Sequence, residues 1–215
     1  MSDGPDGSGM RILSSPECMA EGARWLAASE PRFADLLARQ GVPPLRRHGD
    51  GFPALLRAIV AQQVSNSAAH AIWTRIEAAG LDDRSRLSGA PDDALRGCGL
   101  SRQKIRYARA LAGAQIDYHA LPALPEPAIV STLTAVPGIG RWTAEIYVMF
   151  SLGRADCFAP GDLALQEAAR ALFGLSERPR EAALRAMAAA WSPWRTVAAG
   201  MLWAYYREIT RREGV

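Results

Sequence analysis

The apolar residues of this chain recur at intervals of three and four positions. Leu55, Leu56, Ile59 and Val60 form one such stripe, and similar stripes run through residues 69–76, 105–112 and 165–173. This spacing places apolar side chains on one face of an α-helix, whereas the strict alternation of a half-buried strand is nearly absent. Ala, Leu and Arg, which favour helices, are abundant. The sequence therefore predicts an all-α protein.

Capping and turn residues set the predicted helix boundaries. Ser65 and Ser101 are predicted N-caps, because a short side-chain oxygen can accept from the amides of a first turn. Gly80, Gly153 and Gly174 are predicted C-terminal stops. The helices are expected to cover about 16–29, 31–40, 52–63, 65–79, 91–97, 101–115, 126–135, 141–152, 163–173, 179–191 and 194–212.

The charge and cysteine content exclude several function classes. The net charge is only +3, with 25 Lys and Arg against 22 Asp and Glu, so a histone-like or tail-type nucleic-acid binder is excluded. The three cysteines lie far apart, which fits a reducing compartment and is too few for a four-cysteine zinc or iron–sulfur site. No apolar run reaches the ~20 residues of a membrane span, so we expect no membrane partner.

Residues 133–145 carry the most informative motif, Leu-Thr-Ala-Val-Pro-Gly-Ile-Gly-Arg-Trp-Thr-Ala-Glu. An apolar helix ends, a Pro-Gly-Ile-Gly turn follows, and a new helix begins near Arg141. Gly138 and Gly140 have no Cβ, so they can take positive φ and let another backbone come close. The first amides of the next helix favour an anion, and a DNA phosphate suits that site. A plain helix–helix turn would explain the four turn residues alone, but the flanking residues favour a helix-hairpin-helix that binds DNA.

The motif resembles the helix-hairpin-helix superfamily of DNA glycosylases, whose mark is a hairpin, a Gly/Pro-rich loop and then an aspartate. Three other segments are similar to the branch that removes alkylated bases, the 3-methyladenine DNA glycosylase II type. They are residues 56–65 (LRAIVAQQVS), residues 99–107 (GLSRQKIRY), and Pro-Trp-Arg at 193–195 with Leu-Trp at 202–203. Together these matches cover about residues 50–205.

The resemblance implies two helical subdomains flanking an active-site cleft. One covers residues 50–153 and contains the hairpin at about 129–152, and the other combines 16–49 with 154–215. Residues 1–15 are rich in Gly, Ser and Asp at their start and are expected to be disordered. The family aspartate is Asp162, in the segment Cys-Phe-Ala-Pro-Gly-Asp-Leu, and it would lie at the junction of the two subdomains.

Asp162 is the expected catalytic residue. Glycosidic cleavage passes through a sugar with oxocarbenium character, and a nearby carboxylate stabilises that cation and can activate water. Asp162 could also simply cap the helix that begins at Leu163, and the two roles are compatible. Asp156 is the nearest competing carboxylate and is expected at the surface.

The position of the single lysine predicts a monofunctional enzyme. In related bifunctional glycosylases, a lysine two residues past the second hairpin glycine attacks the sugar. That position here is Trp142, and the chain's one lysine, Lys104, is placed elsewhere by the motif. Schiff-base chemistry needs an amine. We therefore expect water to be the nucleophile and an abasic site to be the product.

The resemblance also implies a base pocket. Trp142 and Trp203 match its aromatic positions, where an electron-rich face favours a flipped, cationic alkylated base. Core packing is an equally weighted alternative for both, and it is the expectation for Trp25, Trp73, Trp191 and Trp194. Ile146 and Leu163 occupy positions that are aromatic in some relatives, so the pocket is expected to be more aliphatic.

The implied DNA contacts come from the hairpin and from two helix starts. Gln63 matches a wedge that fills the gap left by the flipped base, although a helix-end Gln that contacts the backbone explains it equally well. Ser65, Ser101 and Lys104 are candidate phosphate contacts. The remaining candidates are the hairpin residues Gly138, Ile139, Gly140, Arg141 and Thr143. No cofactor is required, but the carbonyls of Thr134, Val136 and Ile139 could hold a structural monovalent cation.

The sequence thus predicts a DNA-3-methyladenine glycosylase that acts in base excision repair on double-stranded DNA with damaged bases. We expect a monomer, located with the nucleoid in the cytoplasm of a bacterium or in the nucleus of a eukaryote. Two alternatives stay open: a helix-hairpin-helix module that binds DNA without catalysis, and a glycosylase for deaminated or oxidised bases.

Overall fold

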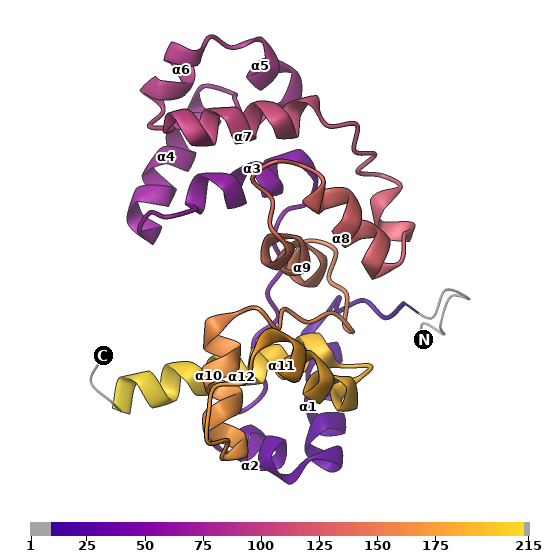
Figure 1. Ribbon diagram of the computed structural model, residues 1–215. Coiled ribbons are helices and arrows are strands. Elements are labelled where there is room, and N and C mark those ends of the chain that lie inside the picture. Colours follow the sequence, from indigo (N-terminus) through magenta and orange to yellow (C-terminus); the bar gives the residue numbers. More distant parts are fainter. Residues whose placement is uncertain (1–9, 213–215) are drawn as a thin grey trace. The chain divides into compact units, whose positions relative to one another are not determined.

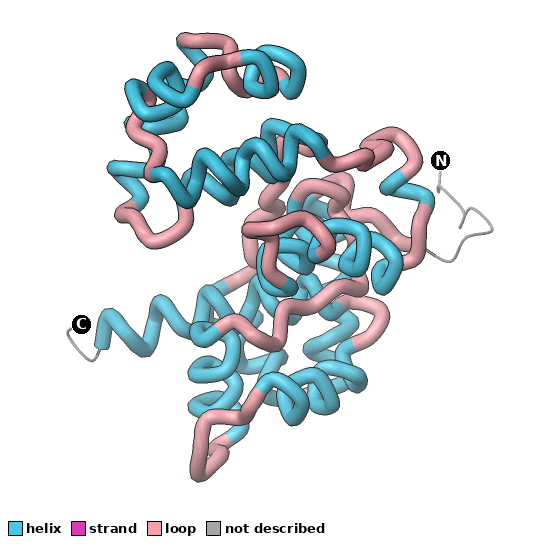
Figure 2. The backbone as a smooth tube through the Cα atoms, turned by 45° about the horizontal axis from the view of Figure 1, so that its top comes forward, coloured by secondary structure: helices cyan, strands magenta, loops and turns pink. Residues whose placement is uncertain are grey.

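A computed structural model describes residues 10–212, and this part of the chain is built from helices joined by loops (Figure 1; Figure 2). No strand is found among the described residues, so the prediction of an all-α protein is confirmed. The helices are α1 Pro16–Ser29, α2 Pro31–Gln40, α3 Gly51–Ala61, α4 Asn66–Ala78, α5 Arg84–Gly89, α6 Asp92–Gly97, α7 Arg102–Gly113, α8 Glu126–Thr134, α9 Arg141–Phe150, α10 Leu163–Phe173, α11 Glu181–Ala188 and α12 Arg195–Arg212, with short 3-10 turns η1 Leu121–Ala123 and η2 Ala189–Trp191.

The helices fall into two compact units. One contains the chain up to Arg47 together with everything from Val148 on, and the other is His48–Tyr147. The second division lies inside α9, whereas the sequence placed it after residue 153. Periodicity does not locate such a boundary, because a helix keeps its own hydrogen bonds when its two ends belong to different cores.

An aromatic cluster forms the centre of the unit that contains both ends of the chain. Trp191 packs against three phenylalanine rings with centroid distances of 5.4–5.9 Å. These rings belong to Phe33 on α2, Phe173 on α10 and Phe158 in the loop before α10. The cluster ties α2 to the segment that leads into Asp162. Trp73, Trp191 and Trp194 are buried as expected, but Trp25 is 37% exposed and is not a core residue.

The segment before α1 corrects the expectation that residues 1–15 are disordered. Ile12 forms an antiparallel bridge with Arg154, and the Leu13 amide donates to the Gly153 carbonyl at 2.7 Å. Leu13 is also buried. Composition missed this pairing because a partner residue so far away in sequence leaves no local signal. Residues 1–9, to which the same expectation applied, lie outside the described part.

The unit His48–Tyr147 is organised around α7, which packs against α3, α5 and α6. The apolar stripes predicted from the sequence supply this core, with Leu55, Ile59 and Leu111 fully buried. Ser65 and Ser101 cap α4 and α7 as predicted, each accepting an amide three residues on. The sequence missed α5, whose six residues begin after the cap Asp83 and are too few to show a period.

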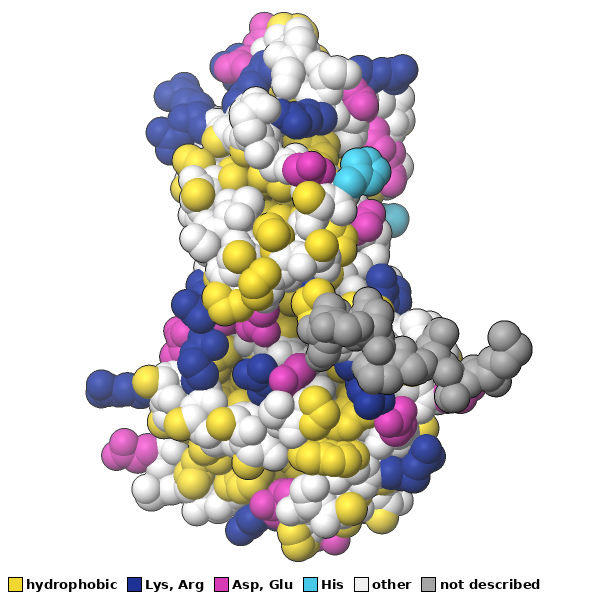
Figure 3. Space-filling view, turned by 90° about the vertical axis from the view of Figure 1, so that its right-hand side faces the viewer, with side chains coloured by type: hydrophobic (Ala, Val, Ile, Leu, Met, Phe, Trp, Pro, Cys, Tyr) yellow, Lys and Arg dark blue, Asp and Glu magenta, His cyan; other side chains and the backbone are white. Residues whose placement is uncertain are grey.

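No helix among residues 10–212 is long and apolar enough to span a membrane. On the face shown in Figure 3, arginines are interspersed with acidic side chains. Within the described range, no three His, Cys, Asp or Glu side chains are grouped so that they could hold a metal ion.

Candidate functional site

The hairpin lies between α8 and α9 and is held by buried side chains. Val136 and Ile139 are buried, and the Ile139 amide donates to the Val136 carbonyl at 3.0 Å, which closes the turn. Gly138 has φ 93°, and a Cβ there would lie 2.3 Å from Cγ of Tyr107. Gly140 is not in the left-handed region, so only one of the two glycines is required by the backbone.

The first turn of α9 follows directly and has the features of an anion site. The amides of a first turn have no partner within the helix and carry partial positive charge. Arg141 is exposed, and its Nε donates to Oε1 of Glu145 at 2.9 Å. Glu145 is only 1% exposed, and no pattern in the sequence marked it as a functional residue. Ile139 and Thr143 are buried, so any phosphate contact they make uses the backbone rather than the side chain.

The loop between α3 and α4 presents Gln63 in an unusual conformation. Its φ is 54°, and no other non-glycine residue among 10–212 has positive φ. The side chain is exposed, as is that of Val64 beside it. The backbone contact weighed for Gln63 is made instead by Gln62, whose Nε2 donates to the Gly138 carbonyl at 2.8 Å. The structure thus separates two adjacent glutamines that the sequence could not distinguish.

Lys104 differs from the expectation of a phosphate contact through its side chain. It is only 8% exposed, and its Nζ donates to the Val60 carbonyl at 2.6 Å. Burial lowers the pKa of its ammonium group. The Gly-Leu-Ser-x-x-Lys spacing places Lys104 on the first turn of α7, but only the packing of α7 against α3 decides that the side chain turns inward. The cap Ser101 remains at the surface.

Asp162 is the N-cap of α10 and belongs to the other unit. Its Oδ1 accepts the Leu165 amide at 3.0 Å and Nε1 of Trp203 on α12 at 3.2 Å. Gln166 is buried and donates to the Pro160 carbonyl at 2.8 Å, which fixes the loop before the cap. Two hydrogen bonds from different helices thereby set the orientation of one half-buried carboxylate.

Asp156, the competing carboxylate, is hydrogen-bonded to side chains near the start of α12. Its Oδ1 accepts from Nε of Arg195 at 2.6 Å, and its Oδ2 accepts from the Ser192 hydroxyl at 2.8 Å. Arg195 also donates to the Asp156 backbone carbonyl. The Pro-Trp-Arg element therefore anchors the loop that contains Asp156, which points to a structural role for this acid.

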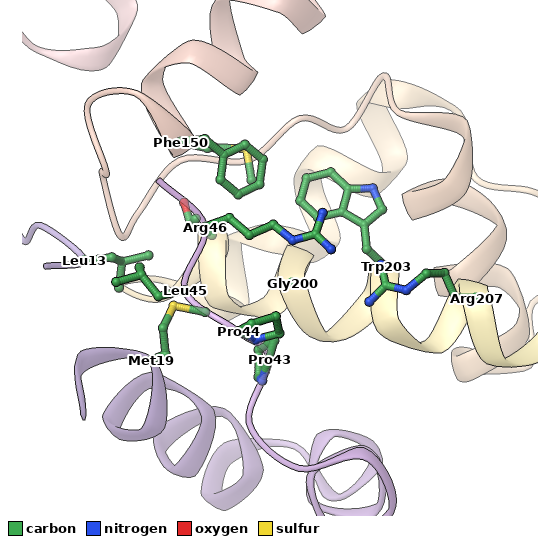
Figure 4. Close-up of a pocket in the computed structure, with 12 residues that line it drawn as sticks. Leu13, Met19, Pro43, Pro44, Leu45, Arg46, Phe150, Gly200, Trp203 and Arg207 are labelled. Carbon is green, nitrogen blue, oxygen red and sulfur yellow. The ribbon is translucent and has the colours of Figure 1, made fainter. Parts of the chain in front are cut away.

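A small cavity lies beside Trp203 (Figure 4). Its volume is about 30 Å³, far below the roughly 300 Å³ at which small-molecule pockets begin. Its lining includes Pro43, Pro44, Arg46, Phe150, Trp203 and Arg207. The rings of Phe150 and Trp203 are 5.6 Å apart between centroids. A purine is larger than this cavity. A base bound here would have to stack on an exposed face of an aromatic ring, or the lining side chains would have to change position.

Two arginines at this cavity were missed by the sequence analysis. Figure 4 shows Arg46 and Arg207 among the side chains that line the cavity together with Trp203. Burial lowers the pKa of Arg207, and the charges of Arg46 and Arg211 lower it further. Arg207 follows Trp203 by four positions on α12, so helical spacing could have identified it. Arg46 comes from a loop, and nothing in the sequence points to it.

The other predicted pocket residues are not among those that line this cavity. Trp142, on the first turn of α9, is 48% exposed, and Leu163, next to Asp162, is 62% exposed. Ile146 is half-buried one turn after Trp142. Large exposed apolar side chains are often used for binding. Trp142 and Ile146 belong to the unit His48–Tyr147, whereas Leu163 and Trp203 belong to the other unit.

Comparison with known proteins relates most of the chain to one family. The model of the HhH-GPD superfamily of base excision DNA repair proteins matches residues 56–195, which include the loop at Gln63, the hairpin and Asp162. The alkylbase DNA glycosidase-like protein mag2 of Schizosaccharomyces pombe is 26% identical over 190 residues, which are 83% of this chain and 89% of that protein.

Solved structures extend the likeness to both units. The crystal structure of a DNA-3-methyladenine glycosidase from Bacillus halodurans gives a TM-score of 0.81 at 32% identity, covering 94% of each chain. The 3-methyladenine DNA glycosylase Mag1 of Schizosaccharomyces pombe, solved in complex with abasic DNA, gives 0.73 at 26% identity, covering 85% of this chain and 95% of that one.

Proposed function

Since the chain belongs to the HhH-GPD superfamily of base excision DNA repair proteins, we propose that it is a monofunctional DNA glycosylase for alkylated purines such as 3-methyladenine. The observation that carries this proposal is the Asp162 carboxylate, held by Trp203 and by the first turn of α10. The names of the relatives, several of them 3-methyladenine glycosylases, support the substrate class. The enzyme acts as a monomer on double-stranded DNA, in the bacterial cytoplasm or the eukaryotic nucleus.

The proposed reaction needs one carboxylate and one water molecule. The target base is flipped out of the duplex, and the bond between its nitrogen and the sugar breaks with the electron pair leaving on the base. Asp162 stabilises the oxocarbenium ion and takes a proton from the water that adds to the anomeric carbon. Opposite charges ~4 Å apart at an effective dielectric constant of ~20 attract by ~4 kcal/mol, which corresponds to roughly a thousandfold in rate.

The proposed grip on DNA uses backbone amides more than charged side chains. The hairpin from Gly138 to Thr143 binds a phosphate, and Ser65 and Ser101 add contacts at two further helix starts. Gln63 is the wedge in this proposal. Its side chain is exposed, and its backbone has a positive φ that few residue types tolerate. Such a grip explains how a net charge of only +3 suffices.

A monovalent cation at the hairpin is part of the proposal. Thr134 ends α8, and the last carbonyls of a helix lie at its negative end without intrahelical partners. Val136 and Ile139 are the other members of the expected carbonyl set. Carbonyl oxygens suit a hard cation, and only that of Thr134 lies at the helix terminus, while that of Val136 also accepts the Ile139 amide at 3.0 Å. When bound, the ion would supply positive charge beside a DNA phosphate.

We expect no covalent enzyme–DNA adduct to be trapped by borohydride. A Schiff base needs an exposed amine, but the hairpin position that would supply it is Trp142, and the Lys104 ammonium is buried against Val60. The measurement is electrophoresis after incubation with lesion-bearing duplex and sodium borohydride, beside a bifunctional glycosylase that traps well. A trapped adduct of this protein would refute the monofunctional mechanism.

The substrate class is tested by release of free bases from DNA. We expect free 3-methyladenine to be released from methylated DNA and to be detected by chromatography. A second candidate substrate, a deaminated purine such as hypoxanthine, is favoured by Arg46 and Arg207, because cations beside Trp203 repel a cationic base and can donate to a carbonyl oxygen. Duplexes with single lesions decide between them. Release of no damaged base at all would favour a binding module without catalysis.

A further inference from the structure

The ammonium group of Lys104 is a buried cation in the unit His48–Tyr147, with the residue only 8% exposed. The described ion pairs include none with this side chain, and burial lowers its pKa. Its Nζ donates to the backbone carbonyl of Val60 at 2.6 Å. A buried cation without a paired carboxylate is unfavourable unless hydrogen bonds compensate for the hydration that it has lost.

The group that Lys104 contacts lies at the end of α3. The last carbonyls of a helix lack intrahelical partners and lie at the negative end of its dipole, so a cationic donor stabilises them. Val60 belongs to this last turn, and the chain leaves the helix two residues later. Lys104 therefore caps α3 from another helix, 44 positions away in sequence.

The capped end leads directly into the strained wedge loop. Gln62 is extended, with φ −62° and ψ 132°, and Gln63 then takes φ 54°. Such a conformation persists in a non-glycine residue only where the surroundings determine it on both sides. Lys104 fixes the chain before the loop, and the cap Ser65, which accepts the Ala68 amide, fixes it afterwards.

The same loop is also tied to the hairpin. Gln62 donates to the Gly138 carbonyl at 2.8 Å. Tyr107, one turn after Lys104 on α7, packs so closely on Gly138 that a Cβ there would lie 2.3 Å from its Cγ. One face of α7 therefore holds the end of α3 with one residue and the hairpin turn with another.

We propose that Lys104 is a positioning residue for base flipping, which acts by capping α3 and holding the Gln62–Gln63 loop in the register that presents Gln63 as the wedge. Gln62 is the second anchor and links this loop to the phosphate-binding turn. The inference rests on the proposed function, because it assigns a step in extrusion of the damaged base. It predicts that loss of either anchor impairs extrusion and not the chemistry at Asp162.

The test compares a lesion paired in a duplex with the same lesion left unpaired. Lys104→Met keeps the apolar stem and removes the ammonium group. We expect it to slow single-turnover excision from the duplex by about tenfold or more, the equivalent of one hydrogen bond to a charged group. The unpaired lesion needs little extrusion, so the loss there should be less than about threefold. Gln62→Leu should repeat this pattern and serves as the second variant if Lys104→Met does not fold.

Two further measurements separate positioning from a general structural effect. The rate of fluorescence rise of 2-aminopurine beside the lesion reports extrusion without chemistry, and it should fall in parallel with duplex excision. Gln63→Ala should cost less in a Lys104→Met background than alone, because the wedge is already misplaced. Arg106→Met removes an exposed charge from the same helix and should weaken DNA affinity at most, leaving the ratio of duplex to unpaired rates unchanged.

Equal slowing on both substrates, or a full Gln63→Ala effect in the Lys104→Met background, would overturn the positioning role. Failure of the proposed function has a different signature. If the unsubstituted protein raises 2-aminopurine fluorescence but releases no base, the glycosylase proposal fails while the fluorescence comparison still tests Lys104. If it neither raises fluorescence nor releases a base, both inferences fail.

Discussion

Asp162→Asn is expected to lower the single-turnover rate of base excision by at least ~100-fold. Asparagine has no negative charge with which to stabilise an oxocarbenium ion and is too weak a base to take a proton from water. Its carbonyl oxygen can still accept the hydrogen bonds of Leu165 and Trp203, which leaves the helix cap and the loop in place. The measurement is release of the damaged base at saturating enzyme, together with affinity for the same duplex.

The binding and stability of this variant make the result specific. We expect its DNA affinity and melting temperature to stay close to those of the unsubstituted protein, because the hairpin belongs to the other unit and asparagine is a good cap. Asp156→Asn is the matched control. That acid is held by Arg195 and Ser192, so its loss should affect stability more than the rate. Near-normal excision by Asp162→Asn, or an equal loss in both variants, would show that another group does the chemistry.

Gly138→Ala is expected to damage the fold of the hairpin and with it DNA binding. The new Cβ would lie 2.3 Å from Cγ and 2.7 Å from Cβ of Tyr107, and this Cβ cannot move without shifting α7. The φ of 93° is itself unfavourable for alanine. Strain of this kind costs of order 1–3 kcal/mol before the clash is counted. We therefore expect the free energy of unfolding to fall by at least ~2 kcal/mol and DNA affinity to fall by about tenfold or more.

Gly140→Ala separates the fold from the DNA contact. A Cβ at Gly140 would meet no heavy atom within 4 Å, and its φ is not in the left-handed region. Its free energy of unfolding, measured by chemical denaturation, should change by less than about 0.5 kcal/mol. If the turn binds a phosphate through its amides, the added methyl group still weakens binding. A Gly138→Ala protein as stable as the Gly140→Ala protein would contradict the close packing, and unchanged affinity in both would remove the hairpin from the DNA interface.

Local patterns were enough to predict most of the helices. Ser65, Ser101 and Gly174 mark ends that the structure confirms, because a cap or a left-handed stop involves neighbours within a few residues. The end of α3 was placed two residues too late. Gln62 and Gln63 are compatible with a helix and give no local stop signal, and what ends the helix is a set of contacts from elsewhere.

The sequence by itself determined the helical class, the hairpin and the identity of the candidate carboxylate. The first two depend on residue types at fixed short spacings, which backbone hydrogen bonds within a helix make decisive. The carboxylate was identified through the resemblance to the glycosylase superfamily. Only the tertiary structure decided which polar groups face one another. Lys104 turns inward to Val60, Trp203 donates to Asp162, and Gln62 rather than Gln63 contacts the hairpin. These partners are 41–76 positions apart, and the direction of a side chain across such a distance depends on how whole helices pack.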